Sequence, residues 1–248
     1  LSSFGQAAFV GIGAYTTAYL TTAVGLSPWL TLPIVLLLAG VIALVIAAIT
    51  LQLSGHYLPL STMAWGLSLY YLFGNLEMLG GHTGISDIPP LHIGATAIES
   101  PALFEPIIWG SVLLVCLLLF NLLDSRAGRA MRALNGGAAM AESFGIHTRH
   151  SKITAFVISA LLASLSGWLY AHFLRFVNPT PFNIGAGVEY LFMAVVGGAT
   201  FLSGAIVGSA VLILLKELLQ ETLPALIGTV GNYELIAFGV IMILLLQR

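Results

Sequence analysis

The chain has 248 residues, of which 58% are hydrophobic and only 7% are charged, and its formal net charge is −2. Soluble domains carry roughly a quarter charged residues, so this composition excludes an ordinary soluble protein and indicates a membrane protein. The single cysteine, Cys116, lies in an apolar run and has no intrachain disulfide partner.

Long apolar segments follow one another along the chain. No Asp, Glu, Lys or Arg precedes Glu77, so no charge interrupts the first three segments. A spanning helix needs about 20 apolar residues, and alternating strands of the barrel type are absent from the sequence. The pattern therefore predicts an all-α, polytopic transmembrane helical bundle with about seven to eight membrane segments in a single domain over 1–248. The segments are 4–24, 29–53, 58–79, 106–123, 153–174, 187–219 and 233–247.

The first segment starts without a polar flank, and the first residue is Leu1 rather than Met. A secretory signal would need a basic start and one short apolar core, which this sequence lacks. We therefore expect the sequence to begin inside a longer polypeptide with further helices before it.

Basic residues predict the orientation in the membrane. Short loops rich in Lys and Arg stay in the cytoplasm. The loop 124–152 is accordingly predicted to be cytoplasmic, and the loop 80–105, which has three carboxylates and no Lys or Arg, to be external. Five of the eight Lys and Arg residues lie in the cytoplasmic loop, namely Arg126, Arg129, Arg132, Arg149 and Lys152.

Small residues form close-packing patterns in the later segments. Ser159, Ala163, Gly167 and Ala171 recur at every fourth position of 153–174 and form one stripe, and Gly204 and Gly208 make a GxxxG pair. Such stripes let helix backbones approach closely, in intrachain packing or at a subunit interface.

Glycines also interrupt two apolar segments. The stretch VVGGATFLSG at 195–204 predicts a break at membrane depth, so 187–219 is either a re-entrant pair of half-helices or two crossings joined by a turn. If the protein moves a solute, we expect the glycine-rich sequences around Gly11 and Gly13 and around Gly197 and Gly198 to line or gate its path, because glycine lets a backbone approach a ligand or a neighbouring helix closely. The alternative role is ordinary helix packing.

Several classes of function are disfavoured by the residue pattern. Ion-coupled transporters keep ionisable residues inside spanning helices, whereas the carboxylates here border the apolar runs. No lysine follows glycine as an ATP-binding phosphate loop requires, and no GxSxG nucleophile pattern occurs. His147 and His150 lack an acidic or cysteine partner for a metal set. We expect no enzyme activity, cofactor, metal or nucleic-acid partner.

The stretch GGAAMAESFGI at 136–146 is unusual because it is Ala-rich and mildly amphipathic inside the basic loop. As a short helix it would place Met140 and Phe144 on one face and Glu142 on another, and Gly145 would terminate it. Two exposed apolar side chains on one face predict a docking site for a cytoplasmic partner. A solvated loop, or a helix lying on the lipid surface with its arginines near anionic headgroups, is the alternative.

The segment AAMAESFGI resembles the Ala-Ala…Gly coupling loop of ATP-binding-cassette (ABC) importer permeases. Ala138, Ala139 and Gly145 match that motif, whereas Gly137 stands where its stricter form has Glu. Five further segments resemble, in order, permeases of the branched-chain (hydrophobic) amino-acid uptake family. These are LSSFGQAAFVGIGAYTTAYL at 1–20, GGHTGI at 80–85, DSRAGRAMRAL at 124–134, AFVISALLASLSGWLYAH at 155–172 and EYLFMAVVGGATFLSGAIVG at 189–208.

This resemblance implies a function that the residues alone do not. In such a system a periplasmic binding protein delivers the substrate to two permeases in the bacterial inner membrane, and two ABC ATPases, as subunits or as a fused downstream domain, drive uptake. Residues 138–145 would insert into the ATPase, and membrane lipid would surround the bundle. Family members carry leucine, isoleucine and valine, and relatives carry urea, amides or aromatic acids. A secondary transporter or channel for small solutes is the rival class, and a non-transporting membrane scaffold is the third.

Overall fold

A computed structural model describes residues 3–52, 57–94, 96–198, 201–227 and 239–240 of the chain. The chain divides into two compact units, Leu1–Gly187 and Val188–Arg248, and each is described by itself. The predicted segment 233–247 falls almost entirely outside the described residues. The described part is largely helical, which confirms the predicted all-α class.

The long helices of the first unit correspond to the first five predicted apolar segments. They are α1 (Gln6–Thr22), α2 (Pro28–Thr50), α3 (Tyr57–Asn75), α4 (Pro101–Asp124) and α7 (Thr148–Leu174). Two short helices, α5 (Arg126–Ala133) and α6 (Ala138–Ser143), lie between α4 and α7. The predicted segment 187–219 forms α8 (Ile184–Val196) and α9 (Leu202–Ile227). The remaining elements are η1 (Glu77–Leu79), η2 (Gly81–Thr83), η3 (Leu134–Gly136), η4 (Thr180–Phe182), β1 (Leu91–Ile93) and β2 (Thr96–Ile98).

Helix boundaries differ from the predicted ones where polar residues are compatible with a helix. α4 begins five residues before the predicted start, because Ser100 caps its first turn and Pro101 occupies the first helical position. α7 includes the basic residues Arg149 and Lys152, which were expected in the loop. In the described part of the chain, α2, α4, α7 and the stretch Leu202–Thr222 of α9 are long and apolar enough to span a membrane. The total of seven to eight membrane segments stays a prediction.

α1 is the central helix of the first unit. Twelve of its seventeen residues are buried, and it packs against α2, α3 and α7. α1 is enclosed on all these sides, and it consists mainly of the small residues Ala, Gly and Thr with three aromatic residues, whereas large aliphatic residues predominate in α2. The exposed leucines of α2, such as Leu37 at 70% exposure, are typical of a lipid-facing surface.

α1 and α7 cross at glycine positions on both helices. A Cβ atom on Gly13 would lie 2.1 Å from the carbonyl oxygen of Ser164, and one on Gly167 would lie 2.0 Å from the carbonyl oxygen of Val10. The Ser164 hydroxyl donates a 3.0 Å hydrogen bond to the Phe9 carbonyl across the same crossing. The small-residue stripe predicted on 153–174 is therefore confirmed as intrachain packing, with Gly167 at the closest point.

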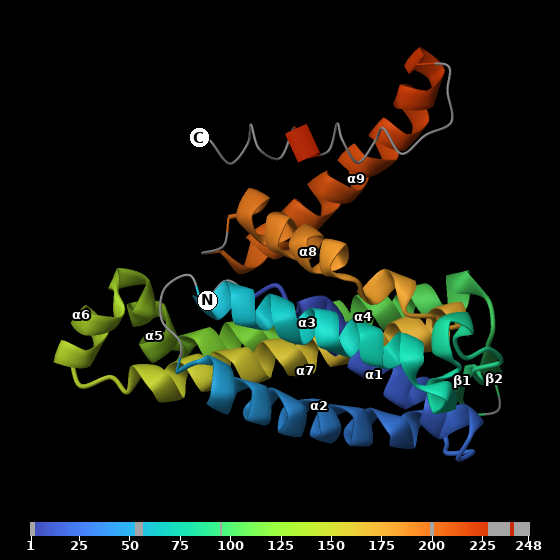
Figure 1. The fold of residues 1–248 in the computed structure, drawn as a ribbon, viewed down its shortest axis with the longest axis horizontal. Helices are drawn as coiled ribbons and strands as arrows, with labels where there is room; N and C mark the ends of the chain where they lie inside the picture. The colour runs from blue at the N-terminus through green and yellow to red at the C-terminus, as the bar shows by residue number, and fades with distance from the viewer. Residues whose placement is uncertain (1–2, 53–56, 95, 199–200, 228–238, 241–248) are drawn as a thin grey trace. The chain divides into compact units, whose positions relative to one another are not determined.

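The two predicted loops lie at opposite ends of the first unit (Figure 1). α1, α3 and α7 run in one direction and α2 and α4 in the other, so β1 and β2 lie at one end and α5 and α6 at the other. This arrangement agrees with the predicted alternation of loops across the membrane. The side on which each loop lies remains a prediction.

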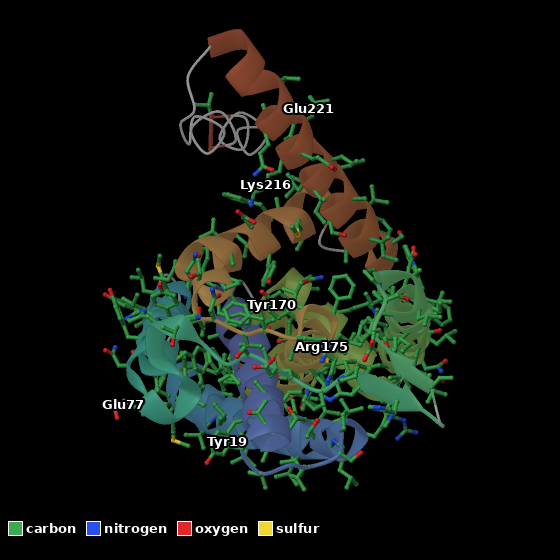
Figure 2. All side chains as sticks on the ribbon, turned by 90° about the vertical axis from the view of Figure 1, so that its right-hand side faces the viewer. Tyr19, Glu77, Tyr170, Arg175, Lys216 and Glu221 are labelled. Carbon is green, nitrogen blue, oxygen red and sulfur yellow. The ribbon has the colours of Figure 1, made fainter. Side chains whose placement is uncertain are left out.

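The end that carries β1 and β2 is organised by a two-stranded hairpin that was not predicted from the sequence. The Trp29 indole donates a 2.7 Å hydrogen bond to the His92 carbonyl, which ties the start of α2 to β1. Arg175, which follows α7 in the left-handed conformation, donates to the Ile88 carbonyl at 3.0 Å. Figure 2 looks onto this end and labels Arg175. Hydrogen bonds to the carbonyls of Ile88 and His92 therefore hold the hairpin region against this end of the bundle.

The helix crossing generates the first prediction. Gly13→Ala should lower the thermal denaturation midpoint of the detergent-solubilised protein, because its Cβ would overlap the Ser164 carbonyl. Overpacking of this kind costs about 1–3 kcal/mol. Gly110→Ala in α4 is the matched control, since nothing lies within 4 Å of its added Cβ and alanine favours a helix over glycine by about 1 kcal/mol. Equal midpoints for the two variants would contradict the close crossing.

Candidate functional site

The loop after α4 folds back onto the end of that helix. Ser125 caps α5 by accepting a hydrogen bond from the Gly128 amide at 3.2 Å. Arg129 donates to the Asp124 carbonyl at 2.5 Å and Arg132 to the Leu123 carbonyl at 2.8 Å. The last carbonyls of a helix lack intrahelical partners and favour cations nearby. Two of the basic residues that predicted the cytoplasmic side therefore also cap α4.

α6 is a short helix whose end is shaped by glycine. Gly145 follows it with φ +76, and its amide donates to the Glu142 carbonyl, while the Ile146 amide donates to the Ala141 carbonyl. This pair of bonds is a Schellman motif, which favours glycine because the left-handed conformation strains other residues. The structure thus places Gly145 at the end of the helix, where a terminator was expected.

The predicted coupling residues are brought together on α6 and its cap. Met140 is 58% exposed and Phe144 is 73% exposed, whereas Ala141 between them is only 1% exposed. Ala138 and Ala139 in the first turn are also exposed. An exposed Met and Phe beside small alanines form an apolar surface that is available for contact, and we call residues 138–145 the coupling segment. What this segment contacts stays a prediction.

Glu142 connects the coupling segment to a long helix. Its Oε1 accepts a 2.6 Å hydrogen bond from the hydroxyl of Thr148, the first residue of α7. A carboxylate is also favourable at a helix N-terminus. Glu142 was expected on the other face of the short helix, but this partner was not predicted. The sequence did contain a signal for this hydrogen bond, because Thr148 lies only six residues after Glu142 and begins the next helix.

Gly11 and Gly13 lie inside the first unit at helix contacts. Gly13 meets the Ser164 backbone, and a Cβ on Gly11 would lie 2.5 Å from the Phe73 ring. The neighbouring side chains form an aromatic cluster in which Tyr15 stacks on Phe73 at 4.8 Å between ring centroids. These two glycines therefore set the distance between α1 and its neighbours, and their predicted contact with a transport path is a proposal.

Gly197 and Gly198 lie in the second unit at the break between α8 and α9. A Cβ on Gly197 would lie 1.7 Å from the Gly204 carbonyl oxygen, and one on Gly208 would lie 1.9 Å from the Met193 carbonyl oxygen. Gly198 has φ +87, which a turn between the helices requires. α8 has 13 residues and is about 20 Å long, so it is too short to cross a bilayer core of about 30 Å.

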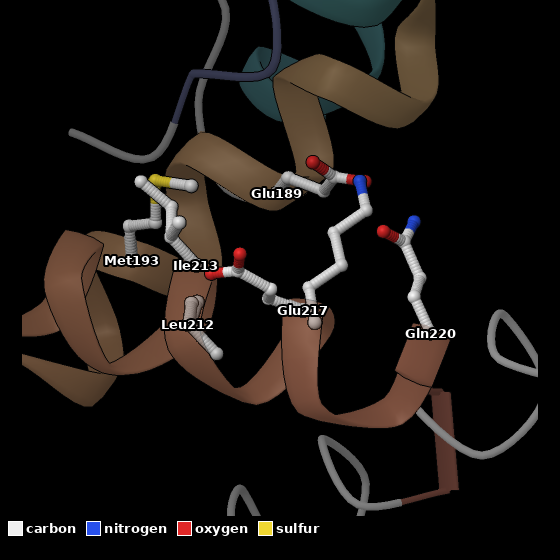
Figure 3. Close-up of a pocket in the computed structure, with 7 residues that line it drawn as sticks. Glu189, Met193, Leu212, Ile213, Glu217 and Gln220 are labelled. Atoms are coloured by element: carbon white, nitrogen blue, oxygen red, sulfur yellow. The ribbon is translucent and has the colours of Figure 1, made fainter. Parts of the chain in front are cut away.

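An ion pair joins α8 to α9, and it was not predicted from the sequence. The Lys216 ammonium lies 2.9 Å from Glu189 Oε1. The two residues line a pocket of about 410 Å³, which Figure 3 shows together with its other lining residues, Met193, Leu212, Ile213, Glu217 and Gln220. Both charges were visible in the sequence, but they are 27 positions apart and only the antiparallel packing of α8 and α9 brings them together.

Metal-ligating side chains do not gather in the described part of the chain. Over the ranges that the structure describes, no group of three or more His, Cys, Asp or Glu side chains could hold a metal ion. The candidate features are therefore the coupling segment, the glycine contacts and the α8–α9 pocket.

Known proteins resemble this chain over most of its length. Residues 1–246 match the family model described as branched-chain amino acid transport system / permease component. The chain is 31% identical to the high-affinity branched-chain amino acid transport system permease protein LivM of Escherichia coli (strain K12), over 98% of the chain and 61% of that protein. It is 29% identical to LivM of Salmonella typhimurium, with the same coverage. It is 24% identical to a probable LivH of Methanocaldococcus jannaschii, over 92% of the chain and 74% of that protein. No solved structure matches significantly.

The Glu142–Thr148 hydrogen bond generates the second prediction. Glu142→Ala should increase hydrogen exchange of the amides in 138–146, because α6 loses its side-chain hydrogen bond to α7. A hydrogen bond to a charged group contributes roughly 1.5–3 kcal/mol, and Glu142 is exposed, so we expect the low end, which is about a tenfold increase in local opening. The measurement is hydrogen–deuterium exchange followed by mass spectrometry.

Ser143→Ala is the control for this experiment. It removes a hydroxyl that, among the residues that the structure describes, bonds within α6 to the Met140 carbonyl at 2.7 Å, and it leaves the Glu142–Thr148 bond in place. If Glu142→Ala exchanges no faster than Ser143→Ala, the bond does not hold α6 against α7.

Proposed function

Since the chain belongs to the family of permease components of branched-chain amino acid transport systems, we propose that it is a transmembrane permease subunit of an ABC importer. It would form part of the translocation path for branched-chain or related amino acids. The chain spans 61% of the length of the LivM proteins that it matches, so the activity, the cargo and the partners are all proposals.

The observation that best supports this function is the coupling segment. An apolar surface on a short helix, exposed at the end of the bundle and hydrogen bonded to α7, is suited to transmit force from a cytoplasmic partner. α7 in turn packs along the central helix α1. A displacement of α6 would therefore be transmitted to the core of the first unit through α7 and α1, which pack tightly against each other.

The proposed partners follow from this role. Two ABC ATPases, as subunits or fused domains, would hydrolyse ATP, because the permease itself is not the catalytic component. A second permease would complete the path, and a periplasmic binding protein would deliver the amino acid at the external side. Such an assembly belongs in the bacterial inner membrane, where lipid surrounds the exposed leucines of α2 and α4.

The glycines have a proposed role in opening the path. Gly11, Gly13, Gly197 and Gly198 lie where helices approach each other most closely or where the chain turns. Contacts without intervening side chains allow helices to slide by small amounts, as shear motions require. We propose that these positions permit the helix movements that open and close the path.

The topology supplies the third prediction. In a Cys116→Ala background, Ser86→Cys and Ala127→Cys should react with a membrane-impermeant thiol reagent from opposite sides. Ser86→Cys should react in intact spheroplasts, and Ala127→Cys only in inside-out vesicles. Both positions are exposed, so each thiol is reachable. Reaction of both residues from one side would overturn the cytoplasmic assignment of the coupling segment.

Docking of the coupling segment supplies the fourth prediction. Phe144→Asp should abolish both amino-acid uptake and the ATP hydrolysis that loaded binding protein stimulates. Burial of a phenylalanine contributes roughly 1.5–3 kcal/mol, and an unpaired carboxylate in the partner's groove adds a further penalty. Membrane insertion should be unchanged, because Phe144 is 73% exposed in the isolated chain. The measurement is uptake and ATPase activity of the reconstituted complex.

Phe144→Leu is the conservative control and should retain most activity. The surface-helix alternative makes a different prediction, in which Phe144→Asp weakens only the association of residues 138–146 with lipid and leaves coupling intact. A Phe144→Asp complex that still hydrolyses ATP in response to loaded binding protein would refute the docking role.

A further inference from the structure

The ion pair of the second unit links α8 to the second half of α9, where polar residues follow a long apolar stretch. Lys216 is about 21 Å along α9 from its start at Leu202, at 1.5 Å per residue. Charged side chains in spanning helices are costly, and those that are retained face a partner or a cavity and mark functional sites. In this protein the charged side chains have both a partner and a cavity, because Lys216 bonds to Glu189 and the two residues line the pocket between α8 and α9.

The pocket has two chemically distinct sides. Glu189, Lys216, Glu217 and Gln220 supply ionic and amide groups, and Met193, Leu212 and Ile213 supply an apolar wall. Figure 3 shows Glu189 on α8 and Glu217 and Gln220 on α9. Lys216 also belongs to α9, so the polar side chains come from both helices. A volume of about 410 Å³ lies within the range of small-molecule sites, roughly 300–1,000 Å³.

The polar side retains unused bonding capacity. Within the described ranges, the Lys216 ammonium donates one hydrogen bond, to Glu189 Oε1, and an ammonium has three donors. The side chains of Lys216 and Glu189 are 38% and 27% exposed, so both are accessible from the pocket. A purely structural ion pair would not need a second carboxylate, Glu217, and an amide, Gln220, on the same wall.

This set of groups selects the ligand by its charges. A simple anion would meet two carboxylates, and a simple cation would meet the lysine. A zwitterion satisfies both, because its carboxylate can bind Lys216 while its ammonium binds Glu189 or Glu217. An aliphatic side chain on the same molecule would fit against Met193, Leu212 and Ile213.

We propose that the α8–α9 pocket is a binding subsite for an aliphatic α-amino acid, in which Lys216 binds the carboxylate and Glu189 and Glu217 bind the ammonium. The proposal rests on the proposed transport function and deepens it by naming residues that recognise the substrate. The predicted orientation has the segment 187–219 enter the membrane from the external side, so we expect Glu189, close to its start, in the outer half of the membrane. A substrate arriving from outside would meet this half first.

The test uses protection of a thiol by the ligand. In a Cys116→Ala background, the complex is reconstituted in proteoliposomes with Gln220→Cys, which lines the pocket, or with the adjacent Glu221→Cys, which is exposed but outside it. L-leucine should slow maleimide labelling of Gln220→Cys by about tenfold at about ten times its dissociation constant. Labelling of Glu221→Cys should not change.

Ligand analogues test the requirement for both charges. 4-Methylpentanoate lacks the amino group of leucine, and isopentylamine lacks its carboxylate, so neither should protect Gln220→Cys at the same concentration. Lys216→Met should remove the protection by leucine. Protection that survives Lys216→Met, or equal protection by the analogues, would overturn the proposal.

A charge-swapped variant separates ligand binding from a structural role. Glu189→Lys combined with Lys216→Glu keeps an ion pair between α8 and α9 but reverses the groups that the ligand meets. We expect normal assembly without protection by leucine. If the swapped protein is protected and transports as well as the unswapped protein, the pair is only structural.

Lipid headgroups and the transport activity itself supply two further outcomes. If vesicles with phosphatidylethanolamine slow the labelling without leucine and those with only phosphatidylglycerol do not, the pocket holds a zwitterionic lipid headgroup, and the amino-acid proposal fails. If the unsubstituted complex transports no amino acid, the proposed function fails. If it transports leucine but Gln220→Cys is never protected, only the subsite proposal fails.

Discussion

The crossing of α1 and α7 is a close backbone contact at glycines of both helices, and the arrangement of the other helices depends on it. Lipid tails are as apolar as the side chains of these helices, so burial from water does not hold them together. Stability must come from close packing and hydrogen bonds, and both occur where Gly13 meets the Ser164 backbone and Ser164 bonds to the Phe9 carbonyl. Once α1 is held against α7 in this way, α2 and α3 complete the surroundings of the central helix.

The same helix connects the two ends of the first unit. At one end Thr148, the first residue of α7, bonds to Glu142 of the coupling segment. At the other end Arg175, directly after α7, bonds to the Ile88 carbonyl in the loop that carries the β hairpin. A long helix with specific contacts at both ends would link the proposed cytoplasmic partner to the opposite end of the first unit. This link gives physical content to the proposed ATP-driven mechanism.

In the second unit, glycine contacts between α8 and α9 help to determine where a pair of charged side chains lies. Gly197, Gly204 and Gly208 bring α8 and α9 together near the turn, while Glu189 and Lys216 are paired farther from it. A short helix next to a long one leaves α9 partly uncovered, so the charges lie beside a pocket instead of in a closed core. Close packing at one end of this hairpin therefore positions polar groups at the other.

The sequence by itself determined the membrane class, the helical segments of the first unit and the basic loop, because composition, hydropathy and local charge are properties of neighbouring residues. Residues 136–146 also stood out by the spacing of Met140, Phe144 and Gly145. Only the tertiary structure decided which groups meet. The partner of Lys216 is 27 positions away, and the backbone that faces Gly13 belongs to a helix about 150 positions later. The β hairpin likewise depends on loop contacts with α2 and α7. Periodicity reports which face of a helix is apolar or small, but it carries no information on which distant helix will cover that face.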